Sequence, residues 1–200
     1  MKNWSTWAAL SCDYFYHCGL QNPVHGQMGM AGLLTVLAAG GEKIAYSDGP
    51  PYFKDYHWLL GEFDAAWHFD PPQAGNLPPF EPDYFLVNGK SGDALDDYNA
   101  EDVAVFSALD QLPVFLNITH SGVGRREVIF PYLVEASVVI RNGEPQIPAL
   151  PVDTFALSPA ESVGLMLLAV SRTLILKGVE EGEKVMTHGA YEVKMMYLNQ

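Results

Sequence analysis

The chain has 200 residues, of which 48% are hydrophobic and 18% charged, and a formal net charge of −13. This length fits one large domain or two small ones, and the apolar content excludes a mainly disordered chain. The acidic balance excludes nucleic acid as an expected partner, because affinity for phosphates depends on Lys and Arg. No apolar run approaches the ~20 residues that cross a bilayer, and the start has no apolar region long enough for a signal peptide.

The first half of the chain predicts short strands separated by turn-rich loops. Residues 13–18 and 31–38 are aromatic or aliphatic and predict two strands, joined by a loop that contains four Gly or Pro residues. Residues 39–55 carry Gly-Gly, Asp-Gly and Pro-Pro pairs and predict a linker. A strand is expected in "YHWLLGEF", then a loop in "HFDPPQAGNLPPFEP", then a strand ending in an Asn-Gly turn in "DYFLVNGKSG".

The second half is a series of β-favouring runs punctuated by Gly, Pro, Asn and Asp. They are "VAVFSAL", "LPVFLNIT", "REVIFPYLVEASVVIRNGEPQ", "DTFALSP", "SVGLMLLAV", "SRTLILKG" and "YEVKMMYL". The run "AESVGLMLLAVSRTLIL" is apolar enough for a buried helix, but its Val, Thr, Ile and Ser content favours strands. Regular short strands predict an antiparallel sandwich or barrel.

The loop between the first two strands gathers metal-binding side chains. Cys18 ends the first strand, His25 follows seven residues later, and Met30 follows five after that. A thiolate, an imidazole and a thioether are a soft ligand set that suits copper, and two His, one Cys and a weak axial Met form the blue-copper electron-transfer site. Met28 competes with Met30 for the axial role.

His17 precedes Cys18 directly, so on a strand the two side chains point to opposite faces. His17 could then bind a second metal, with the His-Cys peptide as a covalent link between two centres. A disulfide between Cys12 and Cys18 is the alternative role for the thiols. It is disfavoured because ~20 Å separates residues six apart along an extended strand.

The segment "YFYHCGLQNPVHGQMGMAGLLTV" resembles the copper-binding segment of multicopper oxidases and of copper nitrite reductases. Those segments read Tyr-His-Cys, then a loop with His, then Gly-Met-x-Gly and an aliphatic strand. The resemblance implies that Cys18, His25 and Met30 bind a type 1 copper. It also implies that His17 is a ligand of a type 2/type 3 centre, or of a type 2 copper if the kinship is with nitrite reductases.

Later segments extend the resemblance over most of residues 13–170. "PDYFLVNGKS", "LPVFLNITHSGVG" and "NGEPQIPALPVDTFALSPAESVGLMLLA" are similar to strands and turns of the family's next domain. The implied fold is all-β, with cupredoxin-like Greek-key β-sandwiches. Residues 1–50 would be the C-terminal part of a first domain and residues 51–200 a nearly complete second one. Members of the family are commonly exported, which implies a periplasmic or extracellular location.

The chain also departs from the family. No His precedes His17, so the upstream blue-copper His and the His-x-His pair are missing, and Gly19 stands where oxygen-reducing members have another His. His57 and His68 are expected to be hydrogen-bonded, half-buried side chains and His120 a turn residue, while His188 is the likelier spare ligand. Met195 and Met196 are expected in a strand, and "DALDDYNAED" lacks the spacing of a calcium loop.

Three hypotheses remain open at this point. The first is a copper redox protein, a piece or reduced version of an oxidase that reduces oxygen or nitrite, with no electron donor identified. The second is a copper-free, truncated or degenerate cupredoxin-like structural or interaction module. The third is completion in trans, in which a second copy in a homo-oligomer, or a missing N-terminal segment, supplies the absent His. A partial first sandwich would expose apolar sheet edges and favour such a partner.

Overall fold

The computed structural model describes residues 12–20, 22–39, 43–69, 76–95, 112–130 and 134–169. The helical elements there are α1 (Asn22–Gln27), α2 (Ala65–Phe69) and the 3₁₀ helix η2 (Gly92–Leu95). The strands are β1 (Cys12–His17), β2 (Ala31–Val36), β3 (Lys54–Phe63), β4 (Tyr84–Val87), β5 (Val114–His120), β6 (Arg126–Ile129), β7 (Val134–Arg141), β8 (Glu144–Val152), β9 (Thr154–Leu157) and β10 (Ser162–Ala169).

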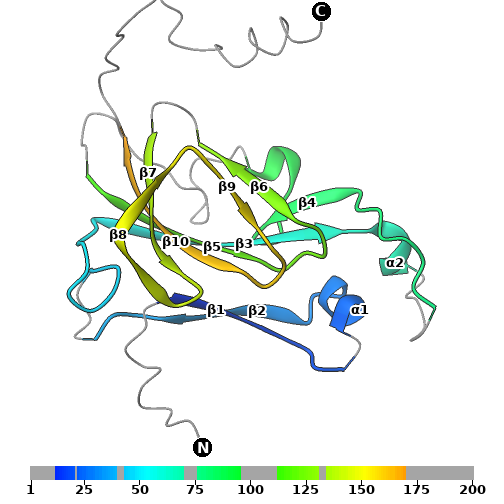
Figure 1. The fold of residues 1–200 in the computed structure, drawn as a ribbon. Coiled ribbons are helices and arrows are strands. Elements are labelled where there is room, and N and C mark those ends of the chain that lie inside the picture. Colours follow the sequence, from blue (N-terminus) through cyan, green and yellow to red (C-terminus); the bar gives the residue numbers. More distant parts are fainter. Residues whose placement is uncertain are drawn as a thin grey trace, which may run out of the picture.

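The strands form a layered β structure around one central sheet (Figure 1). Six strands hydrogen-bond in the order β4-β3-β5-β10-β7-β8, with β3 and β5 parallel and the other neighbours antiparallel. The pair β6-β9 lies on one side of this sheet and the hairpin β1-β2 on the other. The all-β layered architecture expected from the sequence is therefore confirmed.

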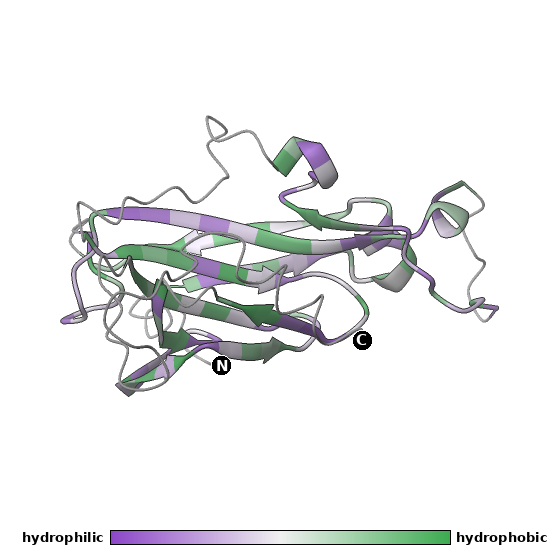
Figure 2. Cartoon of the chain, turned by 90° about the horizontal axis from the view of Figure 1, so that it is seen from above, coloured by the Kyte–Doolittle hydropathy of each residue, from purple (hydrophilic) through white to green (hydrophobic). Residues whose placement is uncertain are grey.

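Strand β5 is buried along its whole length because both of its faces are covered. Val114, Leu116 and Ile118 belong to a core that also contains Leu157 of β9 and three residues of β10. Phe115 points the other way, into a smaller core with Cys12 of β1. Hydrophobic residues accordingly line the strands of these layers in Figure 2. The buried polar residues Thr119 and His120 of β5 are hydrogen-bonded, as burial of polar groups requires.

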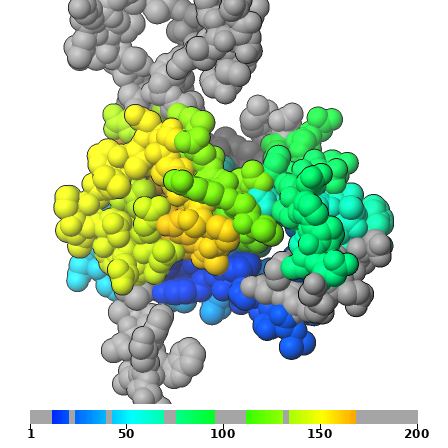
Figure 3. Space-filling view, turned by 45° about the vertical axis from the view of Figure 1, so that its right-hand side comes forward, coloured from blue at the N-terminus to red at the C-terminus, as the bar shows by residue number. Residues whose placement is uncertain are grey.

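The hairpin β1-β2 forms a separate two-stranded sheet that packs against the central one. Its register pairs Cys12 with Val36 and His17 with Ala31. Figure 3 shows this segment, in blue, along the lower edge of the molecule. On it, the side chains of Tyr16 and Leu34 are each 60% exposed. Apolar exposure on the hairpin was expected from a partial first sandwich.

The Asn-Gly turn predicted after "DYFLV" is confirmed, and a second Asn-Gly turn joins β7 to β8. Asn88 and Gly89 follow β4 with φ of 51° and 78°, and Asn142 and Gly143 join β7 to β8 with φ of 49° and 82°. Two successive positive φ values match the right-handed twist of a hairpin, and Asn and Gly adopt them most readily. The strand assignment for "SVGLMLLAV" is also confirmed, since Ser162–Ala169 forms β10.

Some expectations were wrong or lie outside the described residues. The loop after Cys18 contains α1, and the loop after β3 begins with α2, so two short helices stand where only loops were expected. "VAVFSAL", "SRTLILKG" and "YEVKMMYL", with His188, Met195 and Met196, lie outside the described residues. Among the helices described, none is long and apolar enough to cross a membrane.

Candidate metal centre

The three residues expected to bind copper meet in one compact loop. The Sγ atom of Cys18 lies 3.0 Å from Nδ1 of His25. The backbone N–H of Cys18 donates to the carbonyl of Met30 at 3.0 Å, and the N–H of Met30 donates to the carbonyl of His25 at 2.9 Å. Three hydrogen bonds thus tie these residues pairwise. Both cysteines are free thiols, so the alternative of a disulfide between Cys12 and Cys18 is wrong.

A helix-ending turn places Met30 beside His25. Helix α1 ends with the N–H of Gly29 bonded to the carbonyl of Gly26 at 3.0 Å and the N–H of Met30 bonded to that of His25 at 2.9 Å. This is the Schellman arrangement, in which the residue after the helix takes a left-handed conformation. Gly29 has φ of 83° and supplies it without steric cost. Strand β2 then begins at once.

The donor set fits a soft metal in part. Cys18 and His25 are half-buried, whereas Met30 is 53% and Met28 39% exposed, so both thioethers remain accessible. Among the described residues, no group of three or more His, Cys, Asp or Glu could hold a metal. A cysteine sulfur, one imidazole and a thioether are therefore present, and the described part of the chain adds no second imidazole to them.

His17 faces a different space from Cys18. Its Nδ1 lies 2.9 Å from the carbonyl of Cys18. Because a carbonyl can only accept, Nδ1 carries the hydrogen, and Nε2 of the neutral ring keeps its lone pair. The ring also borders a cavity of about 220 Å³ lined by Phe15, His17, Gly26, Gln27, Ser121, Gly122, Val123, Pro159 and Ala160. The other lining residues include no His, Cys, Asp or Glu.

A buried carboxylate organises the loop between β5 and β6, which lines this cavity. The side chain of Glu62 is 1% exposed and forms an ion pair with Arg126. It accepts the backbone N–H of Val123 at 2.8 Å and that of Gly124 at 3.2 Å. The guanidinium of Arg126 also lies 4.1 Å from the ring centre of Phe85. Glu62 thereby fixes the wall of the cavity opposite the hairpin.

His120 was expected to be a turn residue at a strand end, whereas the structure places it within the strand itself. It ends β5 and is completely buried. Its Nε2 donates to the carbonyl of Gly124, and its Nδ1 accepts the N–H of Gly122 at 3.3 Å. A Cβ atom on Gly122 would come within 2.5 Å of the His120 ring. The β5–β6 loop packs closely on His120, and its backbone forms hydrogen bonds with both ring nitrogens. This packing cannot be seen in the sequence.

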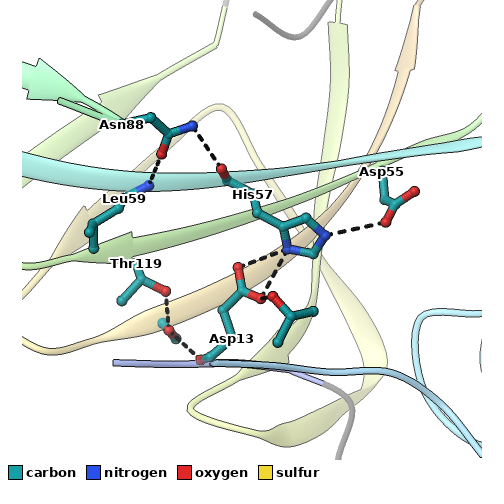
Figure 4. Close-up of polar contacts among 8 residues, drawn as sticks. Asp13, Asp55, His57, Leu59, Asn88 and Thr119 are labelled. Atoms are coloured by element: carbon teal, nitrogen blue, oxygen red, sulfur yellow. Dashed lines mark hydrogen bonds and ion pairs between the residues drawn. The ribbon is translucent and has the colours of Figure 1, made fainter. Parts of the chain in front are cut away.

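The other two described histidines are half-buried, as expected. His68 lies on α2 with its ring centre 4.6 Å from that of Phe63. Its buried Nδ1 has no hydrogen-bond partner among the residues that the structure describes, which differs from the hydrogen-bonded side chain expected. His57 is hydrogen-bonded, as expected, and it anchors the hairpin. Its Nδ1 lies 2.9 Å from both carboxylate oxygens of Asp13, and its Nε2 lies 3.2 Å from Oδ2 of Asp55 (Figure 4).

The Asp13 carboxylate is the centre of a group of polar contacts that attaches the β1-β2 hairpin to the central sheet. We call this group, formed by Asp13, Thr35, His57 and Ser162, the hairpin dock. The Asp13 side chain is fully buried and also accepts the hydroxyl of Thr35 at 2.7 Å. The Asp13 carbonyl accepts the hydroxyl of Ser162 at 2.8 Å, and that hydroxyl bonds to Thr119. These contacts therefore join β1, which Cys18 follows directly, to strands β2, β3, β5 and β10 (Figure 4).

The dock changes the pKa of groups around it. Burial alone would lower the pKa of His57, but hydrogen bonds and charge attraction, first from Asp13 and then from Asp55, outweigh it and raise that pKa above its ordinary value. Burial also raises the pKa of Cys12 to about 11. The thiol of Cys12 thus stays protonated at neutral pH, unlike a thiol that serves as a metal ligand.

We predict that stability falls as pH rises through the pKa of His57. A raised folded-state pKa contributes stability that is fully present below the unfolded value, about 6.5, and is lost above the folded value. Urea midpoints measured between pH 6 and pH 9 should therefore decrease. His57→Gln should flatten this slope, because glutamine does not titrate. A midpoint that rises over the range, or an unchanged slope in the variant, would contradict the assignment.

Sequence reasoning missed the residues that hold the site in place, namely Asp13, Gln27 and Glu62. Gln27, the last residue of α1, bonds through its side-chain amide to backbone groups of Glu62 and Asp64. A buried Asp in an aromatic strand and a Glu at the end of an apolar one were the available signals, because isolated buried charges require partners. Their partners, 44 and 64 residues away, could not be read from spacing.

Comparison with solved structures identifies the fold. No protein-family model matches the sequence, and no relative is found among curated proteins. The blue copper oxidase of Nitrosomonas europaea matches with a TM-score of 0.62 and 20% identity over 80% of this chain and 46% of that chain. The laccase of Botrytis aclada matches with a TM-score of 0.55 and 16% identity, over 82% and 30%.

A copper nitrite reductase, also from Nitrosomonas europaea, matches with a TM-score of 0.53 and 12% identity over 80% of this chain and 53% of that chain. The chain thus spans about half the length, or less, of these proteins. At such identities the similarity concerns the fold. The chain has the cupredoxin-like fold found in multicopper oxidases, laccases and copper nitrite reductase.

Proposed function

We propose that this protein is a copper-binding electron-transfer module of the multicopper oxidase type. Cys18, His25 and Met30 would hold a type 1 copper, and His17 would face a second copper centre. The observation that supports this most is the 3.0 Å contact between Sγ of Cys18 and Nδ1 of His25, in a loop whose backbone also bonds to Met30. The similar structures are named as copper or multicopper enzymes, which favours copper over other soft metals.

Copper bound by these donors would supply a one-electron redox couple. The chain's own residues provide the geometry. Strands β1 and β2 hold the two ends of the loop, and the Schellman turn at Gly29 sets Met30 against His25. The hydrogen bond from Nδ1 of His17 to the carbonyl of Cys18 adds a second link beside the peptide bond. This bond leaves Nε2 of His17 as the nitrogen available to a second metal.

The expected result of titrating the metal-free protein with Cu(II) is one equivalent bound with a thiolate-to-copper absorption band. Cys18→Ser should abolish the band and weaken copper binding at least a hundredfold, because the thiolate is the strongest soft donor of the set. Cys12→Ala is the matched control, because it removes the other thiol, which is buried and has no proposed ligand role. It should leave the band unchanged.

A copper-free structural or interaction module is the second candidate. One observation favours it: the described residues offer no second imidazole to Cys18 and His25. Metal analysis of the freshly purified protein separates the candidates. Less than one tenth of an equivalent of copper, together with no band on titration, would establish the copper-free module and overturn the first proposal.

Completion in trans is a testable refinement of the first candidate. His17 borders its cavity with no other His, Cys, Asp or Glu among the lining residues, so a second centre needs ligands from another copy or from elsewhere in the protein. Sedimentation with and without copper tests the first source. A second equivalent of copper that binds only in the oligomer, and is lost in His17→Ala, would support it.

A further inference from the structure

We infer that Gln27 is a positioning residue that holds His25 against Cys18 by anchoring α1 to the end of β3. The inference rests on the proposed metal site. Gln27 ends α1, two residues after His25. Its Nε2 donates to the carbonyl of Glu62, and its Oε1 accepts the N–H of Asp64 at 2.9 Å. The side-chain amide thus bonds to the backbone carbonyl of Glu62 and the backbone N–H of Asp64, the same two groups that a neighbouring strand would bond to.

The anchor point is itself rigid. The Glu62 side chain is held by Arg126 and two backbone N–H groups of the β5–β6 loop. The Asp64 carboxylate caps the start of α2 by accepting the N–H of Trp67 at 2.9 Å, and it also accepts the N–H of Glu81 at 2.9 Å. Gln27 therefore connects the metal-binding loop to a point where several elements meet, and any movement of α1 must break both amide bonds.

Helix α1 depends on this anchor because it has only six residues. Isolated helices shorter than about 12–15 residues are marginal in water, so α1 cannot hold its own shape. His25 lies within it, and the carbonyl of His25 also binds the N–H of Met30. Loosening Gln27 should thus loosen His25 and Met30 together. Gln27 also lines the cavity beside His17, so the same residue adjoins both proposed centres.

The chemistry of the anchor requires an amide. One terminal atom must donate and the other must accept, and the neutral carboxamide of glutamine offers both in one plane. Methionine has a similar length but neither group. Glutamate retains an acceptor for the N–H of Asp64 but presents a second oxygen to the carbonyl of Glu62. Gln27→Met should therefore remove both bonds, and Gln27→Glu should remove one and add repulsion.

The test compares Gln27→Met and Gln27→Glu with Gln146→Met, a matched change on β8, where the glutamine donates to the carbonyl of Glu144 at 3.3 Å. In metal-free protein, amide exchange of Met30 should accelerate tenfold or more in Gln27→Met. The ¹⁵N shift of His25 Nδ1 should also move, as its contact with Cys18 is lost. Exchange within β5 should not change, which distinguishes positioning from general destabilisation.

A second arm uses Cu(II). Gln27→Met should weaken binding at least tenfold and shift the thiolate-to-copper band, while Gln146→Met matches the wild type. If His25 shifts and Met30 exchange stay at wild-type values in both Gln27 variants, the inference is overturned. If the wild type binds no copper but the metal-free changes occur, the positioning role holds and the copper function fails. If Gln27→Met does not fold, Met30 amide exchange and the His25 ¹⁵N shift measured in Gln27→Glu test the inference instead.

Discussion

Glu62→Leu is expected to lower the free energy of unfolding by about 3–5 kcal/mol, the cost of breaking a buried ion pair by removing one partner. The Glu62 side chain is 1% exposed, and it satisfies Arg126 and the backbone N–H groups of Val123 and Gly124. Arg126 is 32% exposed and can recover some hydration, which favours the lower end of the range. Glu62→Gln should cost less, about 1–3 kcal/mol, because it keeps one acceptor.

Urea unfolding followed by tryptophan fluorescence measures this effect. The matched control is Glu144→Gln at an exposed position on β8, where the change should stay within about 0.5 kcal/mol. The β5–β6 loop should also show faster amide exchange in Glu62→Leu, since Glu62 fixes its backbone. A loss below about 1 kcal/mol in Glu62→Leu would show that the carboxylate does not hold the loop.

Asp13→Asn is expected to destabilise the protein by about 2–3 kcal/mol at pH 6. The Asp13 side chain is fully buried and pairs with His57, which is 28% exposed, so solvent reduces the cost from that of a wholly buried pair. At pH 9 the loss should be smaller, because the protonated fraction of His57 falls as pH rises and a neutral His57 has no charge to pair. The difference between the two pH values therefore measures the ion pair itself.

Asp55→Asn provides the control, because Asp55 contacts the other nitrogen of the same imidazole but is 32% exposed. It should cost less than about 1 kcal/mol at either pH, as surface ion pairs do. Equal losses for the two variants would mean that burial of Asp13 is unimportant. A loss in Asp13→Asn that does not change between pH 6 and pH 9 would contradict the ion pair.

The strands of the site could be predicted because their signals are local. An aromatic run before Cys18 and an aliphatic run after Met30, with glycines between them, are sufficient to give β1, β2 and a connecting loop. The pairing of Cys18 with His25 also follows from that loop, since both residues lie within it. Asn88 and Asn142 mark their turns through conformations that Asn and Gly favour.

The rest depends on tertiary packing and has no local signal. Helix α1 is shorter than two turns and leaves too few positions for a 3.6-residue pattern. His120 follows an apolar run and precedes Ser-Gly, which is typical of a turn, yet the β5–β6 loop folds back over it and buries it. Asp13 has its partner on β3, and only the docking of the hairpin brings them together.

The connections of the hairpin also order the events of folding. The loop from Cys18 to Met30 closes through hydrogen bonds between residues at most 12 positions apart, whereas the dock bonds Asp13 to Ser162, 149 residues away. Closing a short loop costs less entropy than joining distant segments, and local contacts form earlier. During synthesis the loop therefore emerges and can close long before β10 exists. Under the proposed function, a soft metal ion would meet Cys18 and His25 on a nascent chain, before the arrival of β10 docks the hairpin.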